Sequence, residues 1–326
     1  AINVSGRGFD SVVSPAGELP LNDAACTLCG QCILVCPTGA LSEVDSTRKV
    51  WEALGDPKKH VVVQTAPAIR VALGEEFGLA PGSIVTGQMV AALRALGFDR
   101  VFDTNFTADL TILEEGNELL QRLTTGGTLP MITSCSPGWI KFIEHFYPDM
   151  LGNLSTCKSP QQMFGALAKT YYAEKAGVDP AEMFVVSIMP CTAKKFECER
   201  PEMRSSGYQD VDAVLTTREL ARMLREAGID PIALEPASYD APLGIGTGAA
   251  VIFGATGGVM EAALRTVYEV VMKKELPSLD FREVRGFEGI KEAEVALGDT
   301  TVRVAVAHTL GNARKLLERV DRKSTR

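Results

Sequence analysis

The chain has 326 residues and a formal net charge of −8 at pH 7, from 41 acidic residues against 33 lysines and arginines. This length can bury a large core, so we expect one large domain and a small appendage. The acidic balance, without a basic stripe, argues against nucleic acid as a partner. Apolar stretches such as 249–253 are too short to cross a bilayer, and the sequence does not open with a charged-then-apolar leader. We therefore expect neither membrane insertion nor secretion.

Four of the eight cysteines lie close together near the start of the chain, and Pro37 follows them: Cys26, Cys29, Cys32 and Cys36. The resulting C-x2-C-x2-C-x3-C-P pattern is typical of ferredoxin-type iron–sulfur modules. Thiols at this spacing favour a 4Fe-4S cluster over disulfides, and therefore a reducing, cytoplasmic compartment. A zinc knuckle or a chance cluster of thiols is the alternative.

The fourth cysteine of such a pattern has a special position, because in two-cluster ferredoxins it binds the other cluster. By that rule Cys26, Cys29 and Cys32 hold one cluster and Cys36 holds a second. The matching second run of cysteines is not in this sequence. Either it was lost from an upstream segment, or the cluster is held in an unconventional way.

Beyond His60 the sequence alternates between apolar runs and helical periodicity, and we place a boundary within residues 46–59. Residues 1–50 are then a partial ferredoxin-like module, and residues 60–326 form the larger domain. Strands are predicted over 61–66, 100–103, 129–134, 184–189, 212–216 and 250–255. Helices are predicted over 87–96, 108–123, 138–146, 159–176, 217–227 and 257–273. This order predicts an α/β fold with mostly parallel sheets covered by helices. Residues 292–297 and 302–308 predict a hairpin, and 311–320 a final helix.

Two more cysteines lie where a predicted buried strand breaks at a proline. Residues 133–139 are Thr-Ser-Cys-Ser-Pro-Gly-Trp, and residues 189–197 are Met-Pro-Cys-Thr-Ala-Lys-Lys-Phe-Glu. The ends of strands in an open α/β sheet are where such folds bind ligands. A single free cysteine is more often a small buried apolar residue, but Cys135 and Cys191 together favour a functional site.

These two segments resemble the first two cluster-binding motifs of the iron-only ([FeFe]) hydrogenases, and the resemblance extends from about residue 23 to about residue 315. It implies reversible reduction of protons to dihydrogen. It also implies two cofactors: a 4Fe-4S cluster, and the H-cluster, a 4Fe-4S cubane linked to a di-iron centre with CO and cyanide ligands. The implied partner is a ferredoxin or another electron-carrying subunit.

The resemblance also implies roles for single residues. Cys135 is the thiol next to the open iron, Cys191 is a ligand of the cubane, and Lys194 donates a hydrogen bond to a cyanide. The residues that would wall a dry pocket around the iron are Pro67, Gln161 and Met189.

A proton path is implied by the stretch 102–115, which resembles the corresponding stretch of the family. Glu115, Glu118 and Ser155 would relay protons between Cys135 and solvent. The two glutamates lie three residues apart on a predicted helix and share one face. Without the resemblance, these two glutamates would be interpreted as part of a solvent-exposed helix face.

The resemblance departs from the family at Ser136, where the family has the cysteine that ligates the cluster. A hydroxyl is a poorer ligand than a thiolate for an iron–sulfur cluster, so we expect weak cluster retention and little turnover. The third motif, with two more cluster cysteines, is absent, and the domain is therefore expected to be C-terminally incomplete. An engineered Cys-to-Ser exchange would explain Ser136.

The alternative function is a hydrogenase-like iron–sulfur assembly or sensory protein without turnover, whereas a plain electron-transfer subunit would leave most of the chain unexplained.

Overall fold

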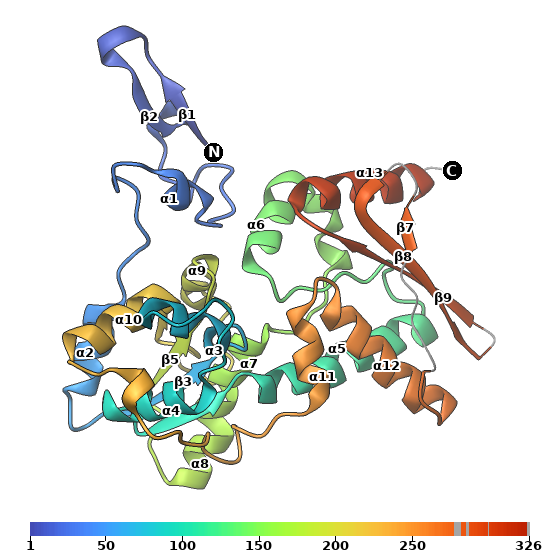
Figure 1. The fold of residues 1–326 in the computed structure, drawn as a ribbon. Coiled ribbons are helices and arrows are strands. Elements are labelled where there is room, and N and C mark those ends of the chain that lie inside the picture. Colours follow the sequence, from blue (N-terminus) through green and yellow to red (C-terminus); the bar gives the residue numbers. More distant parts are fainter. Residues whose placement is uncertain (277–281, 285–286, 299, 325–326) are drawn as a thin grey trace. The chain divides into compact units, whose positions relative to one another are not determined.

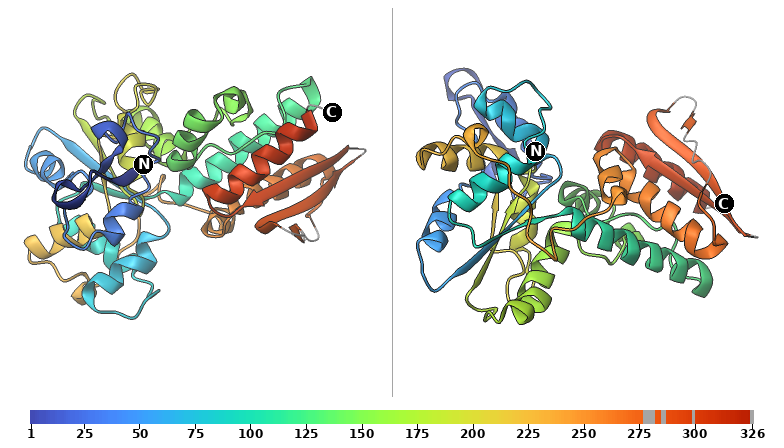
Figure 2. Two further views of the ribbon diagram at one scale, coloured as in Figure 1. Left: turned by 90° about the horizontal axis from the view of Figure 1, so that it is seen from above. Right: turned by 60° about the horizontal axis from the view of Figure 1, so that its bottom comes forward.

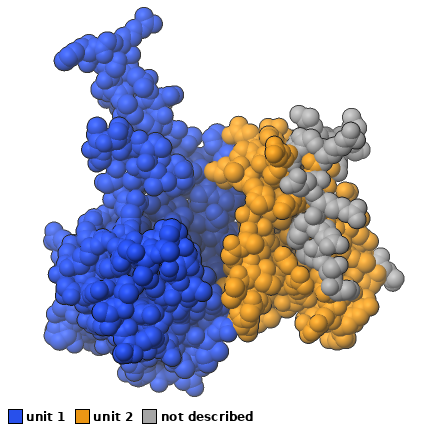
Figure 3. Space-filling model, viewed as in Figure 1, with its two compact units in different colours: residues 1–107, 134–151, 158–246 blue, residues 108–133, 152–157, 247–326 orange. Residues whose placement is uncertain are grey.

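The computed structural model describes residues 1–276, 282–284, 287–298 and 300–324 (Figure 1). They form two compact units, coloured separately in Figure 3. Unit 1 comprises residues 1–107, 134–151 and 158–246, and unit 2 comprises residues 108–133, 152–157 and 247–326. The chain passes from one unit to the other several times, so each unit is built from segments that are distant in sequence.

The core of unit 1 is a parallel sheet with the strand order β4–β3–β5–β6. Its strands are β3 (His60–Thr65), β4 (Arg100–Asp103), β5 (Met183–Ile188) and β6 (Ala213–Leu215). In the central strand, Val63 pairs with Val101 on one side and with Val186 on the other. These strands are buried almost throughout, as expected for a parallel sheet with both faces covered.

Helices surround this sheet, as Figure 2 shows. They are α2 (Thr47–Leu54), α3 (Ile69–Ala72), α4 (Thr86–Ala95), α7 (Pro160–Leu167), α8 (Ala173–Ala176), α9 (Ala193–Glu199) and α10 (Thr217–Glu226). Helix α6 (Pro137–Phe146) also belongs to unit 1 and packs against α9. A π-helical turn, η5 (Ala168–Tyr172), joins α7 to α8. Phe164 of α7 and Tyr172 both pack against Phe102 of β4, which places α7 and η5 on the sheet. The α/β fold with a parallel sheet is therefore confirmed.

The N-terminal part of unit 1 contains elements that the sequence did not indicate. An antiparallel hairpin of β1 (Ile2–Ser5) and β2 (Val12–Pro15) is followed by α1 (Gln31–Val35) within the cysteine run. Helix α2 lies where we placed the boundary, and its Val50 is fully buried in the core of unit 1.

In the described part of unit 2, three long helices pack against an antiparallel sheet. The elements are α5 (Asn105–Thr125), whose first turn belongs to unit 1, α11 (Gly248–Val251), α12 (Gly258–Met272), β7 (Arg282–Val284), β8 (Phe287–Leu297), β9 (Thr300–Ala307) and α13 (Leu310–Ser324). Leu264 and Val267 of α12 form a core with Val295 of β8 and with leucines of α5. The predicted hairpin and final helix are present.

Two predicted strands are wrong. Residues 250–255 continue from α11 into a 3-10 turn, because Thr247 caps a helix by accepting a hydrogen bond from the Ala249 N–H (3.1 Å). A short apolar run does not distinguish a buried strand from a buried helical turn. Residues 129–134 form one isolated bridge, Ile132 with Leu154, and Pro130 lacks the N–H that a sheet partner would need.

Short 3-10 turns complete the fold: η1 (Gly8–Asp10), η2 (Ala16–Glu18), η3 (Leu73–Phe77), η4 (Pro148–Asn153), η6 (Pro231–Ala233) and η7 (Ile252–Gly254). Among the residues that the structure describes, none of the helices has both the length and the apolar character to cross a membrane.

Candidate functional site

The N-terminal cysteines carry free thiols on a loop with left-handed backbone. Leu28 and Gly30 have φ values of +56° and +74°, which turn the chain between Cys26 and Cys32. The Leu28 N–H donates to Cys26 Sγ at 3.4 Å, the kind of amide-to-sulfur contact that accompanies iron–sulfur ligation. In the described part of the chain, no group of three or more His, Cys, Asp or Glu side chains is arranged to hold a metal ion. The fit to a cluster therefore rests on donor chemistry and loop conformation.

Cys36 differs electronically from an ordinary thiol. A hydrogen bond with the Thr38 hydroxyl (3.6 Å) and backbone hydrogen bonds from Leu41 and Thr38 lower the pKa of Cys36 to about 7. The thiolate is the form that binds iron, so these contacts prepare Cys36 as a ligand.

Cys191 lies in the short connection between β5 and α9, at the carboxyl end of the parallel sheet. Met189 follows β5 and is only 4% exposed, whereas Pro67 follows β3 and is half-buried. Because Thr65 pairs with Ile188, both residues leave the sheet at the same edge. The expected position of Cys191 at a strand end is correct. Cys135 instead follows an irregular segment and precedes α6.

Lys194 connects the two cysteine motifs. Its Nζ donates to the Cys135 carbonyl oxygen at 2.9 Å and pairs with Glu197 Oε2 at 2.9 Å. Glu197 is buried and also accepts hydrogen bonds from Ser159 Oγ (2.9 Å) and Gln161 Nε2 (3.0 Å). The structure therefore brings Cys135, Lys194 and Gln161 together around Glu197. Sequence reasoning missed Glu197, although its spacing of three residues from Lys194 on a helix was a usable signal.

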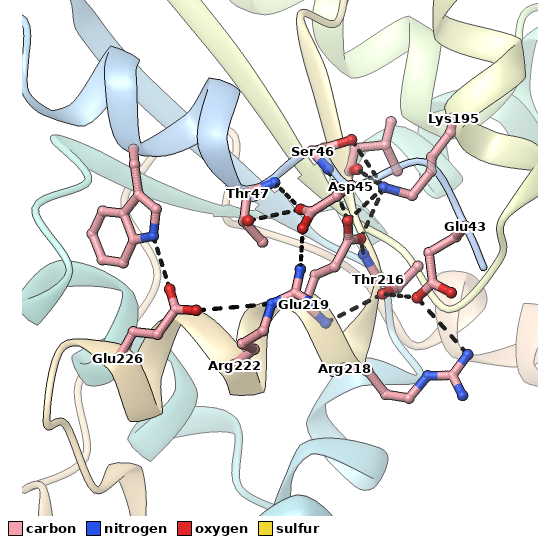
Figure 4. A network of polar contacts seen from close by, with 12 residues as sticks. Glu43, Asp45, Ser46, Thr47, Lys195, Thr216, Arg218, Glu219, Arg222 and Glu226 are labelled. Atoms are coloured by element: carbon pink, nitrogen blue, oxygen red, sulfur yellow. Dashed lines mark hydrogen bonds and ion pairs between the residues drawn. The ribbon is translucent and has the colours of Figure 1, made fainter. Parts of the chain in front are cut away.

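Lys195, the next residue along α9, faces a different network, which Figure 4 shows. Its Nζ donates to Ser46 Oγ (2.9 Å) and pairs with Glu219 Oε2 (2.8 Å). Glu219 also accepts from the backbone N–H groups of Ser46 and Thr216, the latter completing a capping box at the start of α10. Ser46, in the segment that follows the cysteine module, is thus hydrogen-bonded to Lys195 of α9, the helix that follows Cys191.

Ser136 is exposed and is the N-cap residue of α6, where its side chain makes no capping hydrogen bond. Pro137 occupies the first turn, a position where its missing N–H costs nothing. The helix therefore does not depend on the hydroxyl of Ser136.

The expected proton-path residues of unit 2 lie on α5 and in the segment 152–157. Ser155 Oγ donates to Glu118 Oε2 at 2.7 Å, and Thr156 N–H donates to the same carboxylate (3.0 Å). Arg122 pairs with Glu118 Oε1 at 2.6 Å, one helical turn further on. Glu115 is 1% exposed and lies on the same helix. Glu118 and Ser155 are thus in direct contact, and Arg122 is a residue that sequence reasoning missed.

Two opposing effects set the pKa of Glu118, because burial alone would raise the pKa of a carboxylate used in a proton relay toward neutrality. Burial does raise its pKa, but the hydrogen bonds from Ser155, Thr156 and Arg122 outweigh it, and the net pKa lies below the ordinary value. Glu118 is a carboxylate at neutral pH. Next to it, burial raises the pKa of Cys157 to about 11, which keeps that thiol protonated.

Comparison with known proteins identifies the family. Residues 59–326 match the model described as "Iron only hydrogenase large subunit, C-terminal domain", and residues 19–42 match "4Fe-4S binding domain". The chain therefore belongs to the iron-only hydrogenase family and carries a 4Fe-4S binding segment. These matches confirm the cofactor classes expected from the sequence, a 4Fe-4S cluster and the H-cluster.

Individual relatives agree with the family. The chain is 58% identical to the NADP-reducing hydrogenase subunit HndD of Solidesulfovibrio fructosivorans, over 96% of this chain and 54% of the relative. It is 49% identical to iron hydrogenase 1 of Clostridium pasteurianum, over 86% of this chain and 49% of the relative. The chain thus spans about half the length of these two relatives.

A solved structure and a more distant relative complete the comparison. The apo [FeFe]-hydrogenase HydA1 of Chlamydomonas reinhardtii, in a variant form, superposes with a TM-score of 0.75 at 45% identity, over 84% of this chain and 78% of that one. The cytosolic iron-sulfur assembly component 3 of Mus musculus is 29% identical over 94% of this chain and 67% of its own length.

The donor groups fit the two cofactors to different degrees. A 4Fe-4S cluster is held by four cysteine thiolates, and the N-terminal loop supplies four thiols within eleven residues. At the second site this chain offers the thiol of Cys191 and, from the first motif, the hydroxyl of Ser136. The N-terminal residues fit their cluster, and the residues around Cys191 fit the cubane only in part.

Proposed function

We propose that this chain is the catalytic-domain portion of an [FeFe] hydrogenase, which interconverts two protons and two electrons with dihydrogen. The observation that carries the proposal is the Lys194 side chain, which joins the Cys135 and Cys191 motifs through the Cys135 carbonyl and Glu197. A structural lysine of this kind, held in place by a buried carboxylate, gives a defined cation beside the backbone carbonyl of Cys135 in the first motif. The metal cluster, when bound, supplies the redox chemistry.

The protein's own residues would handle binding and protons. Cys191 would ligate the cubane, Lys194 would donate a hydrogen bond to a cyanide, and Pro67, Gln161 and Met189 would line the pocket. Cys135 would deliver protons beside the reacting iron. A dry pocket strengthens each of these electrostatic contacts because the local dielectric constant is low.

Proton supply would use Glu115, Glu118 and Ser155. The 2.7 Å contact of Ser155 Oγ with Glu118 supports one relay step, in which the serine hydroxyl passes its proton to the carboxylate while its oxygen takes up a proton from the next group of the path, so that the serine stays neutral. Because its pKa is lowered, Glu118 is ionised before this step and can accept a proton. It would hold the proton briefly, because the Arg122 guanidinium favours the charged form.

Electrons would enter through the cluster held by Cys26, Cys29 and Cys32, from a ferredoxin or another electron-carrying subunit, and Cys36 would bind a second cluster. The cytoplasm is the expected compartment, because thiols at this spacing need a reducing environment. Two-cluster ferredoxins remain the precedent for assigning Cys36 to a different cluster from the other three.

The decisive measurement is an iron and acid-labile sulfide count on the reconstituted chain, together with infrared spectra in the region of bound CO and cyanide. Bands for both ligands support the proposal, whereas hydrogen evolution with reduced methyl viologen is expected to be low, because Ser136 replaces a thiolate ligand. Iron–sulfur content without such bands contradicts it.

A second function, as an iron–sulfur assembly or sensory protein without turnover, is favoured by one specific observation. Ser136 takes the place of a cluster ligand, and the mouse assembly component aligns over nearly the whole chain. In that case Ser136→Cys should leave the infrared spectrum free of CO and cyanide bands even when iron retention rises.

A further inference from the structure

The loop between the first two cysteines touches the segment that follows Cys191. Thr192 Oγ1 donates a 2.8 Å hydrogen bond to the Leu28 carbonyl oxygen. Gly30 faces the same hydroxyl, since a Cβ on this residue would lie 2.8 Å from Thr192 Oγ1. All of these residues belong to unit 1. The N-terminal loop is therefore fixed one residue away from Cys191.

Leu28 has both of its backbone polar groups engaged in a left-handed conformation. Its φ of +56° is uncommon for a residue with a side chain and persists only where surrounding contacts hold it. The N–H donates to Cys26 Sγ at 3.4 Å, and the carbonyl accepts from Thr192. Thr192 thus stabilises the conformation from which Leu28 reaches the sulfur.

We propose that Thr192 is a positioning residue that tunes the reduction potential of the N-terminal cluster, by holding the Leu28 N–H on the sulfur of Cys26. An amide that donates to a cluster sulfur stabilises the more negative, reduced state and so raises the potential. The inference rests on the proposed function only in assigning this cluster to Cys26 and its neighbouring cysteines.

The effect is expected to be local, because a second attachment holds the far end of the module. Lys195 Nζ donates to Ser46 Oγ at 2.9 Å, and Glu219 accepts from the Ser46 N–H at 2.9 Å. When the Thr192 hydroxyl is removed, the loop around Leu28 should loosen while residues 43–54 keep their contacts.

The test compares three variants of the full chain. Thr192→Val removes the hydroxyl and keeps the branched shape, Thr192→Ser keeps the hydroxyl, and Thr170→Val is the matched control. Thr170 Oγ1 also donates to a backbone carbonyl, that of Ala166 (2.7 Å), on an exposed helical face. Each variant is checked for its melting temperature and iron content.

The first readout is backbone amide exchange of the apo chain. Thr192→Val should raise the exchange rate of peptides covering 26–32 at least several-fold and leave 43–54 unchanged, while Thr192→Ser and Thr170→Val should match the parent. Equal exchange in Thr192→Val and the parent overturns the proposal, as does equal acceleration in Thr192→Ser or Thr170→Val.

The second readout is the midpoint potential of the reconstituted N-terminal cluster, followed by electron paramagnetic resonance. Thr192→Val should shift it to a more negative value, and Thr192→Ser should restore the parent value. An unshifted potential in Thr192→Val overturns the proposal. Neither readout depends on hydrogen turnover or on bound CO and cyanide. A parent chain without CO and cyanide bands would therefore count against the proposed function, and the role of Thr192 would still be tested. If no variant assembles the cluster, the cluster assignment fails and amide exchange alone decides the role of Thr192.

Discussion

Lys195 Nζ lies 2.8 Å from Glu219 Oε2, and the two side chains are only 10% and 2% exposed. A buried ion pair is costly to break from one side, because the remaining charge loses its partner without regaining water. This pair fastens the helix after Cys191 to the start of α10 and to Ser46, so its integrity bears on two parts of the fold.

Glu219→Gln should lower the free energy of unfolding by about 2–4 kcal/mol, since it leaves the Lys195 ammonium buried and unpaired. Adding Lys195→Met to this variant should recover part of the loss. Urea denaturation of both variants measures the difference. Glu226→Gln, an exposed position on the same helix, is the control and should cost less than about 1 kcal/mol. A double variant less stable than the single one would contradict the ion-pair account.

Cys29→Ala should abolish the broad visible charge-transfer absorption of the N-terminal module after reconstitution, because a cluster that loses a thiolate ligand is not retained. Cys198→Ala is the control, since Cys198 is buried against the Lys195 carbonyl and far in sequence from the cysteine run. Absorption spectra and iron counts are compared with the parent. An unchanged spectrum in Cys29→Ala would show that the loop does not hold the chromophore.

Ser136→Cys should raise the iron retained by the reconstituted chain, because it adds a soft thiolate near Cys191 in place of a hydroxyl. The exchange should leave stability within about 0.5 kcal/mol, as Ser136 is exposed and its side chain does not cap α6. In a full-length relative that has cysteine at this position and also the third motif, replacing the cysteine equivalent to Cys135 by alanine should lower hydrogen evolution by about 10²–10⁴-fold with iron content unchanged. Evolution at an undiminished rate would remove Cys135 from the proton path.

Glu118→Gln should destabilise the protein at neutral pH and lose this effect in acid. Its folded-state pKa lies below the ordinary value, so the carboxylate contributes stability above that value, and the contribution disappears as the pH falls through the lowered one. With hydrogen bonds to a charged group worth about 1.5–3 kcal/mol, we expect a loss of about 2 kcal/mol at pH 7.

Urea denaturation of parent and variant at pH 7 and at successively lower pH measures this dependence. Glu114→Gln, an exposed carboxylate on the same helix, should show little effect at any pH. A difference between Glu118→Gln and the parent that stays constant into acid would refute the lowered pKa.

Alkylation of the apo chain at pH 7 should label Cys36 far faster than Cys157 or Cys198. The pKa of Cys36 is lowered to about 7, whereas burial raises those of Cys157 and Cys198 to about 11 and about 12. Because only the thiolate reacts, the rates should differ by more than about 100-fold. Peptide mass spectrometry after timed iodoacetamide treatment resolves the three sites, and Thr38→Val should slow the labelling of Cys36.

The sequence predicted the elements that have strong periodicity. The valine-rich run at 61–63 became the central strand, and the apolar residues of 108–123 became the long helix α5. It failed where context decides: residues 250–255 are apolar in either conformation, and the Thr247 cap selects the helical one. The hairpin β1–β2 has few buried residues and so carries no burial pattern to detect.

Several residues that the sequence predicts for the site lie close together in the structure, but the contacts that join them were not predictable. Cys135, Lys194 and Gln161 do come together, but through Glu197, which no motif singled out. No role was predicted for Lys195, and its partner Glu219 lies 24 residues further on, a spacing without any helical or strand signal. The contact of Thr192 with Leu28 spans 164 residues and depends wholly on the tertiary fold.

The close approach of Gly30 to Thr192 restricts how this protein can be re-engineered. A Cβ at position 30 would collide with the Thr192 hydroxyl, and the backbone there is left-handed. An N-terminal module grafted from another protein would therefore need glycine at the position of Gly30. It would also need a backbone carbonyl at the position of Leu28 that can accept the hydrogen bond of Thr192. Chimeras that match only the cysteine spacing would carry a loop that does not pack against the segment after Cys191.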